Sequence, residues 1–339
     1  MARRLTDQQR RRISLQQTRK RNAAGRAVAE LDTTTLAAPE TMLVIAHYGY
    51  QLDVERPHDG AIFRCHLRTN LQPLVTGDHV IVRLPHSDHP NTSNGIVEAG
   101  CDRHSLLSRP DSRGILRPIA ANIDAMLITF APRPQPFAFL IDRYLVAADL
   151  HGIEPVIVCN KMDLLDDETR PEIERLLHIY RQIGYPVFCV SAASQEGLAP
   201  LTEYLRDKTS VIVGQSGVGK SSLIAALLPG VEIATGELSD GADKGKHTTT
   251  TARLYHLPTG GHLIDSPGIR EFELHHIAAE DVLSHFVDLR EYAYNCRFRD
   301  CQHKQEPGCA LLAAEAAGQV FPERLASYRH IVSSILTPG

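Results

Sequence analysis

The sequence contains no stretch of about 18 consecutive apolar residues, the length that a membrane-spanning helix needs. This absence excludes an integral membrane protein. The first residues, Met-Ala-Arg-Arg, continue into a polar and basic segment, whereas a signal peptide needs an apolar core there. We therefore expect a cytoplasmic protein with no membrane partner.

Cysteine is scarce, and its number, seven, is odd. Four cysteines are scattered and three lie close together: Cys65, Cys101, Cys159 and Cys189, then Cys296, Cys301 and Cys309. In a reducing compartment such a cluster indicates a metal site before disulfides. The scattered four are expected to be buried, because free cysteine is among the most buried residue types.

The length of 339 residues, with 43% hydrophobic and 22% charged residues, predicts a soluble protein of two or three domains. The net charge of −4 hides a basic arm. Residues 1–26 hold nine Lys or Arg and one acid, which leaves 27 basic and 39 acidic residues, a net charge of −12, for the rest. The arm has few apolar residues, so we expect it to be disordered when free. It either contacts nucleic-acid phosphates or is a solubilising tail.

Short β-like runs separated by turns extend from Thr41 to about Pro110. They are Met42–Ala46, Ala61–Cys65, His79–Leu84 and Asn94–Glu98. Such spacing predicts a small barrel or sandwich. Beside a basic arm it fits an OB-like nucleic-acid module, although the pattern does not separate an OB-fold from other small barrels.

From about Asn122 apolar strands alternate with longer helical segments, which predicts a parallel sheet covered on both faces. The expected strands are 124–130, 155–159, 186–190, 210–213 and 262–264, and the expected helices are 136–151, 169–183 and 197–206. After about Glu271 the sequence becomes helical again.

Residues Gly214 to Ser221 match the phosphate-loop pattern G-x-x-x-x-G-K-[ST] between a predicted strand and a predicted helix. In this motif backbone N–H groups wrap the phosphates, Lys220 reaches the β- and γ-phosphate oxygens, and Ser221 supplies a Mg²⁺ ligand. The alternative, a glycine-rich turn with a chance lysine, would leave the match at all positions and the flanking elements unexplained.

Asp265-Ser-Pro-Gly268 follows an apolar strand, 45 residues after Lys220. Its carboxylate can hold Mg²⁺ and the Gly268 N–H can contact a γ-phosphate, although the tetrapeptide alone is also an ordinary turn. The intervening loop ends in Lys-His247 and four threonines. The hydroxyls of Thr249 and Thr250 are candidate Mg²⁺ ligands, and a loop that orders on γ-phosphate is typical of a switch.

Two more motifs, Asn160-Lys-Met-Asp163 and Ser191-Ala-Ala193, resemble the guanine-reading N-K-x-D and S-A of translation-factor GTPases. Each ends a predicted strand, where open α/β sheets bind ligands, although either alone could be a plain turn. The resemblance assigns Asp163 to the N1–H and 2-amino group of guanine. It assigns Asn160 and the Ala192 N–H to the O6 edge, with Lys161 packed over the base.

The motif order indicates a circular permutation. In a standard GTPase the phosphate loop comes first, whereas here both guanine motifs precede it. Only the short link Arg206–Thr209 is needed to join the helix after the second guanine motif to the strand before the phosphate loop. The permutation makes the Asp265 motif lead directly into the C-terminal domain.

Cys296-x4-Cys301-x-His303-x5-Cys309 offers three thiolates and one imidazole, the donors of a closed tetrahedral Zn²⁺ site. Four ligands leave no position for water, so we expect one structural zinc per chain. Because this spacing is not a common finger pattern, free thiols beside a surface histidine are the alternative.

The permuted motifs, the barrel and the Cys-Cys-His-Cys cluster together closely resemble the ribosome small-subunit-dependent GTPase A (RsgA) family, from about residue 40 onward. The resemblance implies an OB-fold domain over 41–112, a circularly permuted G domain over 113–273 and a mainly helical zinc-binding domain over 274–339. The basic arm inferred from composition takes residues 1–40. It implies a GTP hydrolase that binds the small ribosomal subunit and its rRNA, acts as a late maturation checkpoint and is stimulated by that subunit. We expect a monomer.

The candidate site residues form four sets. The GTP-binding set is Asn160, Lys161, Met162, Asp163, Ser191, Ala192, Ala193, Gly214, Gln215, Ser216, Gly217, Val218, Gly219, Lys220, Ser221, Ser222, Asp265 and Gly268. The Mg²⁺ set is Ser221, Thr249, Thr250 and Asp265; the zinc set is Cys296, Cys301, His303 and Cys309; the catalytic set is Lys220 and His247.

Ile269 stands where Ras-class GTPases carry a water-orienting glutamine, so intrinsic hydrolysis is expected to be slow. Some GTPases with an apolar residue in place of the glutamine recruit a monovalent cation through an asparagine in the phosphate loop. We do not expect that route here, because Gly217 stands at the position of this asparagine. His247 is a candidate to position the water, or else a loop histidine that faces solvent. Two functions stay open: a GTPase checkpoint enzyme, and a nucleotide-gated RNA-binding adaptor in which turnover is incidental.

Overall fold

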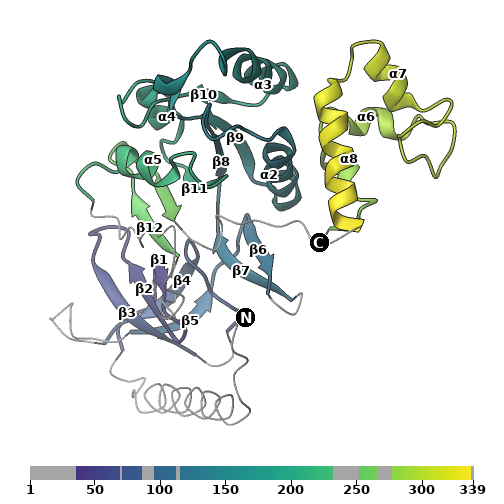
Figure 1. The fold of residues 1–339 in the computed structure, drawn as a ribbon. Helices are drawn as coiled ribbons and strands as arrows, with labels where there is room; N and C mark the ends of the chain where they lie inside the picture. The colour runs from purple at the N-terminus through teal and green to yellow at the C-terminus, as the bar shows by residue number, and fades with distance from the viewer. Residues whose placement is uncertain are drawn as a thin grey trace, which may run out of the picture. The chain divides into compact units, whose positions relative to one another are not determined.

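The structure is a computed structural model that describes residues 36–68, 71–85, 95–111, 115–231, 252–265 and 277–336. It divides into two compact units. The first contains the described residues up to His104 and the short segment that ends at Leu254, and the second contains the rest (Figure 1). Most of the basic arm predicted over 1–40 lies outside the described residues.

The first unit is a five-stranded barrel. Its strands are β1 (Glu40–His47), β2 (Gln51–Glu55), β3 (Ile62–Leu67), β4 (His79–Arg83) and β5 (Gly95–Gly100). They pair in the order β1-β2-β3-β5-β4, and β4 pairs back with β1, which closes the barrel. Alternate side chains fill its interior, and Leu52 and Val54 of β2 are fully buried there. The predicted small barrel is confirmed, whereas β2 was missed because only these two of its five residues are strongly apolar.

A buried ion pair fixes the turn before β4. Asp78 is 1% exposed and receives two hydrogen bonds from Arg103, of 2.6 and 2.7 Å. The same carboxylate accepts the Val75 backbone N–H at 2.7 Å. Because the charge is paired and hydrogen-bonded, its burial does not leave an unsatisfied carboxylate.

The second unit contains the predicted parallel sheet. Its strand order is β10-β9-β8-β11-β13, all parallel. The strands are β8 (Ala125–Phe130), β9 (Glu154–Cys159), β10 (Val187–Cys189), β11 (Thr209–Gly214) and β13 (His262–Asp265). The sequence did not predict the hairpin of β6 (Leu106–Pro110) and β7 (Leu116–Ala121) or the short strand β12 (Arg253–His256).

Helices cover both faces of this sheet, as predicted (Figure 1). One face packs on α4 (Leu198–Tyr204) and α5 (Lys220–Leu227), with Val156, Val158 and Ile212 in that core. The other face carries α2 (Ala138–His151) and α3 (Arg170–Ile183), each of which ends at a left-handed glycine, Gly152 or Gly184.

The described C-terminal segment is helical, as predicted, and packs against α2 through its last helix. Its elements are the 3-10 helix η3 (Val282–His285), α6 (Arg290–Ala293), α7 (Ala310–Ala316) and α8 (Pro322–Leu336). Among the described residues no helix combines the length and apolar character needed to cross a membrane.

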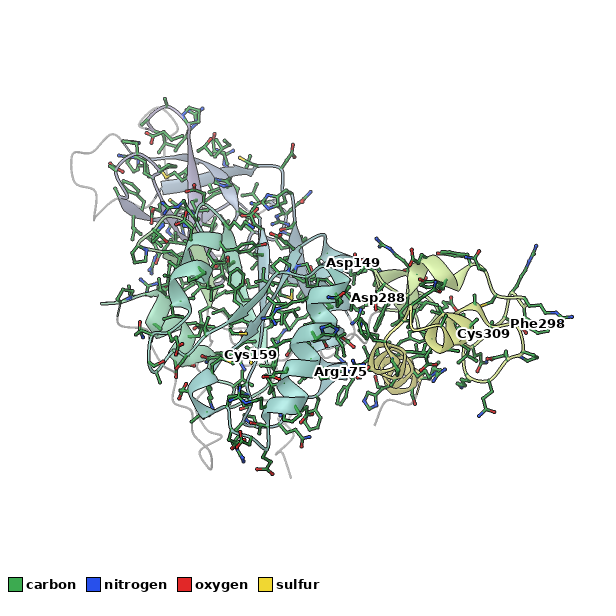
Figure 2. All side chains as sticks on the ribbon, turned by 90° about the horizontal axis from the view of Figure 1, so that it is seen from above. Asp149, Cys159, Arg175, Asp288, Phe298 and Cys309 are labelled. Carbon is green, nitrogen blue, oxygen red and sulfur yellow. The ribbon has the colours of Figure 1, made fainter. Side chains whose placement is uncertain are left out.

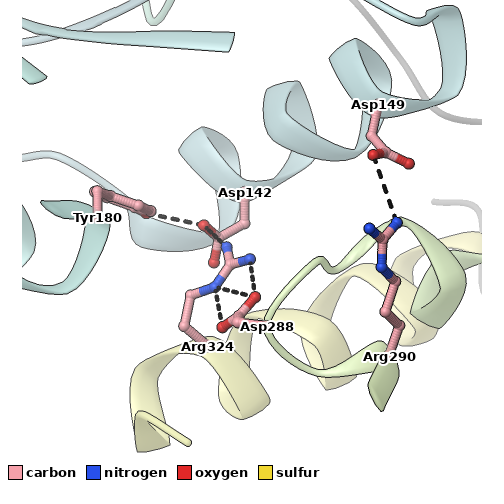
Figure 3. A network of polar contacts seen from close by, with 6 residues as sticks. All are labelled: Asp142, Asp149, Tyr180, Asp288, Arg290 and Arg324. Atoms are coloured by element: carbon pink, nitrogen blue, oxygen red, sulfur yellow. Dashed lines mark hydrogen bonds and ion pairs between the residues drawn. The ribbon is translucent and has the colours of Figure 1, made fainter. Parts of the chain in front are cut away.

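A buried polar network joins α8 to the sheet unit (Figure 3). The guanidinium of Arg324 is 2% exposed and contacts the carboxylates of Asp142 in α2 and Asp288. Tyr180 of α3 donates its hydroxyl to Asp142 at 2.9 Å. Burial raises the pKa of Tyr180 well above its ordinary value, so the hydroxyl keeps its proton and stays a donor. One buried cation thus serves two carboxylates, one from α2 and one from the turn before α6.

Candidate nucleotide site and metal cluster

The predicted phosphate loop lies between the end of β11 and the start of α5. Gly214 has φ +140°, and a Cβ there would lie 2.0 Å from the Thr129 carbonyl oxygen of β8. Because no side chain fits such an approach, the loop can leave the sheet in this direction only through glycine. The turn therefore directs its backbone toward the N-terminus of α5.

Lys220 is the first residue of α5 and folds back over the loop. Its Nζ donates to the carbonyl oxygens of Gly214 and Gln215, both at 2.7 Å. Ser221 and Ser222 follow it in the first turn of the helix. The cluster of loop N–H groups, one ammonium and a helix N-terminus is chemically suited to an anion such as phosphate.

Asn160 connects the two predicted guanine motifs to the phosphate loop. It is 1% exposed and directly follows β9. Its Nδ2 donates to the carbonyl oxygens of Val218 at 3.1 Å and Gly219 at 3.4 Å, while its Oδ1 accepts the Ala192 N–H at 3.1 Å. One side chain therefore holds together three segments that are far apart in the sequence.

Lys161 lies beside the phosphate loop in a left-handed backbone conformation, φ 60°. Its Nζ donates to the carbonyl oxygens of Gly217 at 2.5 Å and Arg133 at 3.3 Å. Pro134 borders the same place, 3.5 Å from where a Cβ of residue 217 would be. The Arg133-Pro134 segment was not among the site residues predicted from the sequence. The available signal was a proline-rich turn directly after β8, at the ligand-binding edge of the sheet.

Asp163 and Ser191 of the two guanine motifs are in contact. The fully buried Ser191 donates its hydroxyl to the Asp163 carboxylate and accepts the Ser194 N–H at 3.1 Å. Met162 donates its N–H to Val190 at 3.1 Å, so both motifs meet at the ends of adjacent strands. Ala193 follows in the turn after Ala192. The serine thereby orients the exposed carboxylate that was predicted to read guanine.

Asp265 ends β13, which pairs with β11, so its backbone lies at the same edge of the sheet as the phosphate loop. The other predicted switch residues, His247, Thr249, Thr250 and Gly268, lie outside the described residues.

The predicted cysteine and histidine ligands come together. The donor atoms of Cys296, Cys301, His303 and Cys309 all lie within 4.8 Å of one another, so the cluster could hold a metal ion. His303 Nδ1 is 3.5 Å from the Cys296 sulfur and 3.4 Å from that of Cys309, and these sulfurs are 3.9 Å apart.

Two side chains that are not candidate metal ligands form hydrogen bonds with backbone groups at the cluster. Arg329 of α8 donates to the His303 carbonyl oxygen at 3.0 and 2.6 Å. Glu306 accepts the N–H groups of Gln302, Lys304 and Gln305. Backbone N–H donors, its own first, lower the pKa of Glu306 to about 2. The carboxylate therefore stays charged and continues to accept these N–H groups. Sequence spacing did not single out either residue.

Known proteins match both the sequence and the structure. The family model described as RsgA GTPase matches residues 100–275. A protein of Pseudomonas aeruginosa (strain PAO1) named small ribosomal subunit biogenesis GTPase RsgA is 52% identical over 310 residues, which cover 91% of this chain and 90% of that protein. A protein of the same name from Azotobacter vinelandii is 51% identical over 316 residues, 92% of this chain and 91% of its own.

Two solved structures share this architecture at 29% sequence identity. YjeQ from Thermotoga maritima has a TM-score of 0.72 and covers 89% of this chain and 100% of its own. YloQ, described as a circularly permuted GTPase, has a TM-score of 0.70 with 89% and 97% coverage. The permuted order inferred from the motifs therefore has a counterpart in a solved structure.

Proposed function

The chain belongs to the RsgA GTPase family, and from this premise we propose that it binds and hydrolyses GTP on the small ribosomal subunit, as a late checkpoint of subunit maturation. The observation that carries the proposal is the set of hydrogen bonds by which Asn160 joins both guanine motifs to the phosphate loop. Base and phosphate recognition are thereby tied to one buried side chain.

Guanine selectivity would come from the Asp163 carboxylate, oriented by Ser191, which can accept from the N1–H and 2-amino group. The Ala192 N–H and Asn160 would face the O6 edge, and Lys161 would pack over the base. Adenine lacks the 2-amino donor and carries an amine at the O6 position. It would leave polar groups of the site unpaired, which is how a binding site rejects an analogue strongly.

Phosphate binding is assigned to the loop Gly214–Ser221, with Lys220 supplying positive charge to the transferring phosphoryl group. Mg²⁺, which neutralises phosphate charge when bound, would be held by Ser221 and Asp265 together with Thr249 or Thr250. Gly268 would contact the γ-phosphate, and His247 would position water because Ile269 cannot.

We assign zinc to the Cys-Cys-His-Cys cluster. Tetrahedral zinc with Zn–S of about 2.3 Å and Zn–N of about 2.0 Å separates neighbouring sulfurs by about 3.8 Å, and sulfur from nitrogen by about 3.5 Å. The separations of 3.9, 3.5 and 3.4 Å in the cluster support this assignment. With four protein donors and no open position, the ion would be structural.

The partner would be rRNA of the small subunit, bound by the barrel as an OB-fold and by the basic arm. The barrel offers two exposed tyrosines, Tyr48 and Tyr50, with the Arg64 guanidinium 4.6 Å from the Tyr48 ring centroid. Aromatic rings and arginine planes stack on unpaired bases. Such a protein would act in the cytoplasm, where subunits mature, and we propose that it acts as a monomer.

The test is GTP turnover with and without purified small subunits, for the unmutated chain, Lys220→Ala and His247→Ala. We expect slow intrinsic turnover in the unmutated chain and strong stimulation of that turnover by subunits. Lys220→Ala should show no turnover with or without subunits. Equal stimulation in His247→Ala would remove only that histidine from the mechanism. GTP-dependent subunit binding without stimulated turnover would replace the enzyme by the RNA-binding adaptor.

A further inference from the structure

Two cysteines lie side by side at the edge of the sheet that carries the guanine motifs. Cys159 ends β9 and Cys189 ends β10, and the two are register partners on these parallel strands. Register partners on parallel strands project from the same face of the sheet. The proposed nucleotide site does not use either thiol. Figure 2 labels Cys159 within the sheet unit.

Each cysteine lies within two residues of a motif that is proposed to read guanine. Asn160 follows Cys159 in the chain, and Ser191 comes two residues after Cys189. The Val190 N–H between these motifs donates to the Cys159 carbonyl oxygen at 2.8 Å. A displacement of the two strand ends would therefore move both motifs relative to each other.

The surroundings of the two sulfurs differ. Cys189 is half-buried, and Arg181 of α3 donates to its sulfur at 3.6 Å, which places a positive charge beside it. Cys159 is fully buried, and burial raises the pKa of its thiol. Because the thiolate is the reactive form and needs access to an oxidant, Cys189 is the sulfur that reacts first.

We propose that Cys189 and Cys159 form a reversible disulfide under hydrogen peroxide, and that this bond weakens guanine-nucleotide binding. The effect on binding rests on the proposed function, whereas the bond itself does not. Neighbouring parallel strands lie about 4.8 Å apart, within the roughly 4.4–6.8 Å that disulfides span between Cα atoms. The Cβ atoms must approach to about 3.8 Å, so the bond draws the strand ends together.

The chemistry has two steps. The Cys189 thiolate attacks one peroxide oxygen, the O–O bond breaks, and sulfenic acid and hydroxide form; the hydroxide takes a proton and becomes water. Cys159 then gives up its thiol proton and attacks the Cys189 sulfur, the S–O bond breaks, and the released hydroxide is protonated to a second water. Two thiols are oxidised and one peroxide is reduced to two waters.

The test treats the full-length, zinc-loaded protein with hydrogen peroxide, then maps linked peptides by mass spectrometry and titrates with a fluorescent GDP analogue. We expect a Cys159–Cys189 linked peptide and a fall in affinity of about fivefold or more, the equivalent of one net hydrogen bond. Dithiothreitol should restore both. Cys189→Ser should keep its affinity after the same treatment, and so should Cys159→Ala.

The control is Cys101→Ser, another half-buried cysteine, which should respond as the unmutated chain does. Absence of the linked peptide overturns the proposal, as does a linked protein with unchanged affinity. An equal loss in Cys189→Ser overturns it too, because oxidation of the zinc-site thiols would then be the cause. If the reduced protein does not bind the GDP analogue, the proposed function fails instead, and the linked peptide still decides whether the bond forms.

Discussion

The amide nitrogen of Asn160 occupies the space that a side chain at Gly219 would need. A Cβ built on Gly219 lies 2.6 Å from Asn160 Nδ2, and Gly219 itself has φ +90°. The absence of a side chain at Gly219 is therefore what lets the phosphate loop approach the buried asparagine, and the contact couples the two halves of the proposed nucleotide site.

We predict that Gly219→Ala weakens GDP binding by about tenfold or more, because it forces Asn160 to move and strains the left-handed backbone. Calorimetric titration measures this. The matched control is Gly230→Ala, with φ +83° and nothing within 4 Å of its new Cβ. Its affinity should stay unchanged although the strain is similar. Equal losses in both variants would show that backbone strain, not the contact with Asn160, is responsible.

Asp163→Asn should weaken GTP binding by about 10- to 100-fold, since the carboxylate acceptor for two base donors is lost. It should admit xanthosine triphosphate, because an amide can donate to the xanthine 2-oxo group. Competition binding with GTP, ATP and xanthosine triphosphate measures the change. Asp167→Asn, an exposed neutralisation in the same segment, should keep the preference for GTP. Equal GTP and ATP affinity in the unmutated chain contradicts the assignment.

Protein purified without chelator should carry one zinc per chain, measured by elemental analysis. Cys309→Ser should lower the stoichiometry and the thermal stability of the C-terminal segment, because metal binding is coupled to folding. Cys101→Ser should leave both unchanged. A stoichiometry near zero in the unmutated protein would refute the zinc site.

Arg324→Ala should destabilise the fold by about 3–5 kcal/mol, because it leaves two carboxylates without their shared cation, one of them fully buried. Urea unfolding measures the free energy. Arg175→Ala is the matched control, since Arg175 joins α3 to Glu323 of α8 at 2.7 Å but is 48% exposed. It should cost no more than about 1 kcal/mol. Similar losses in the two variants would mean that burial does not determine how much each ion pair contributes to the free energy of unfolding.

The stability contributed by the ion pair between Glu154 and Lys208, which lies in the link Arg206–Thr209 of the permuted domain, should depend on pH. Burial opposes ionisation of Glu154, but hydrogen bonds from Lys208, at 2.7 Å, and Tyr204 outweigh it and lower its pKa. A carboxyl with a lowered pKa stabilises the fold above its ordinary value, 4.5, and loses this effect as pH falls through the folded value.

Glu154→Gln should therefore be less stable than the unmutated chain at pH 7, by less than about 1 kcal/mol because the pair is half exposed. The difference should shrink as the pH falls below 4.5 and vanish once it passes the lowered pKa that Glu154 has in the folded chain. Thermal unfolding across pH measures it, with Glu174→Gln, an exposed glutamate paired within α3, as control. A difference that persists at low pH would contradict the electrostatic origin.

The sequence by itself determined the family, the small barrel and the parallel sheet. Apolar strands alternating with helices predicted the parallel sheet, because burial on both faces requires nearly continuous apolar runs. The motifs around Lys220 and Asn160 showed the permuted order, since their chemistry depends on residue type and local spacing. The cluster from Cys296 to Cys309 was equally predictable, because the four candidate metal ligands are close in sequence.

Only the tertiary structure decided the contacts between segments that are distant in the chain. Nothing local to Asn160 shows that its amide reaches Val218, or that Arg324 lies between Asp142 and Asp288. The register that pairs Cys159 with Cys189 is likewise set by the packing of whole strands. Such contacts arise when buried polar groups must find partners wherever the fold brings them, and a one-dimensional pattern records the groups but not their meeting.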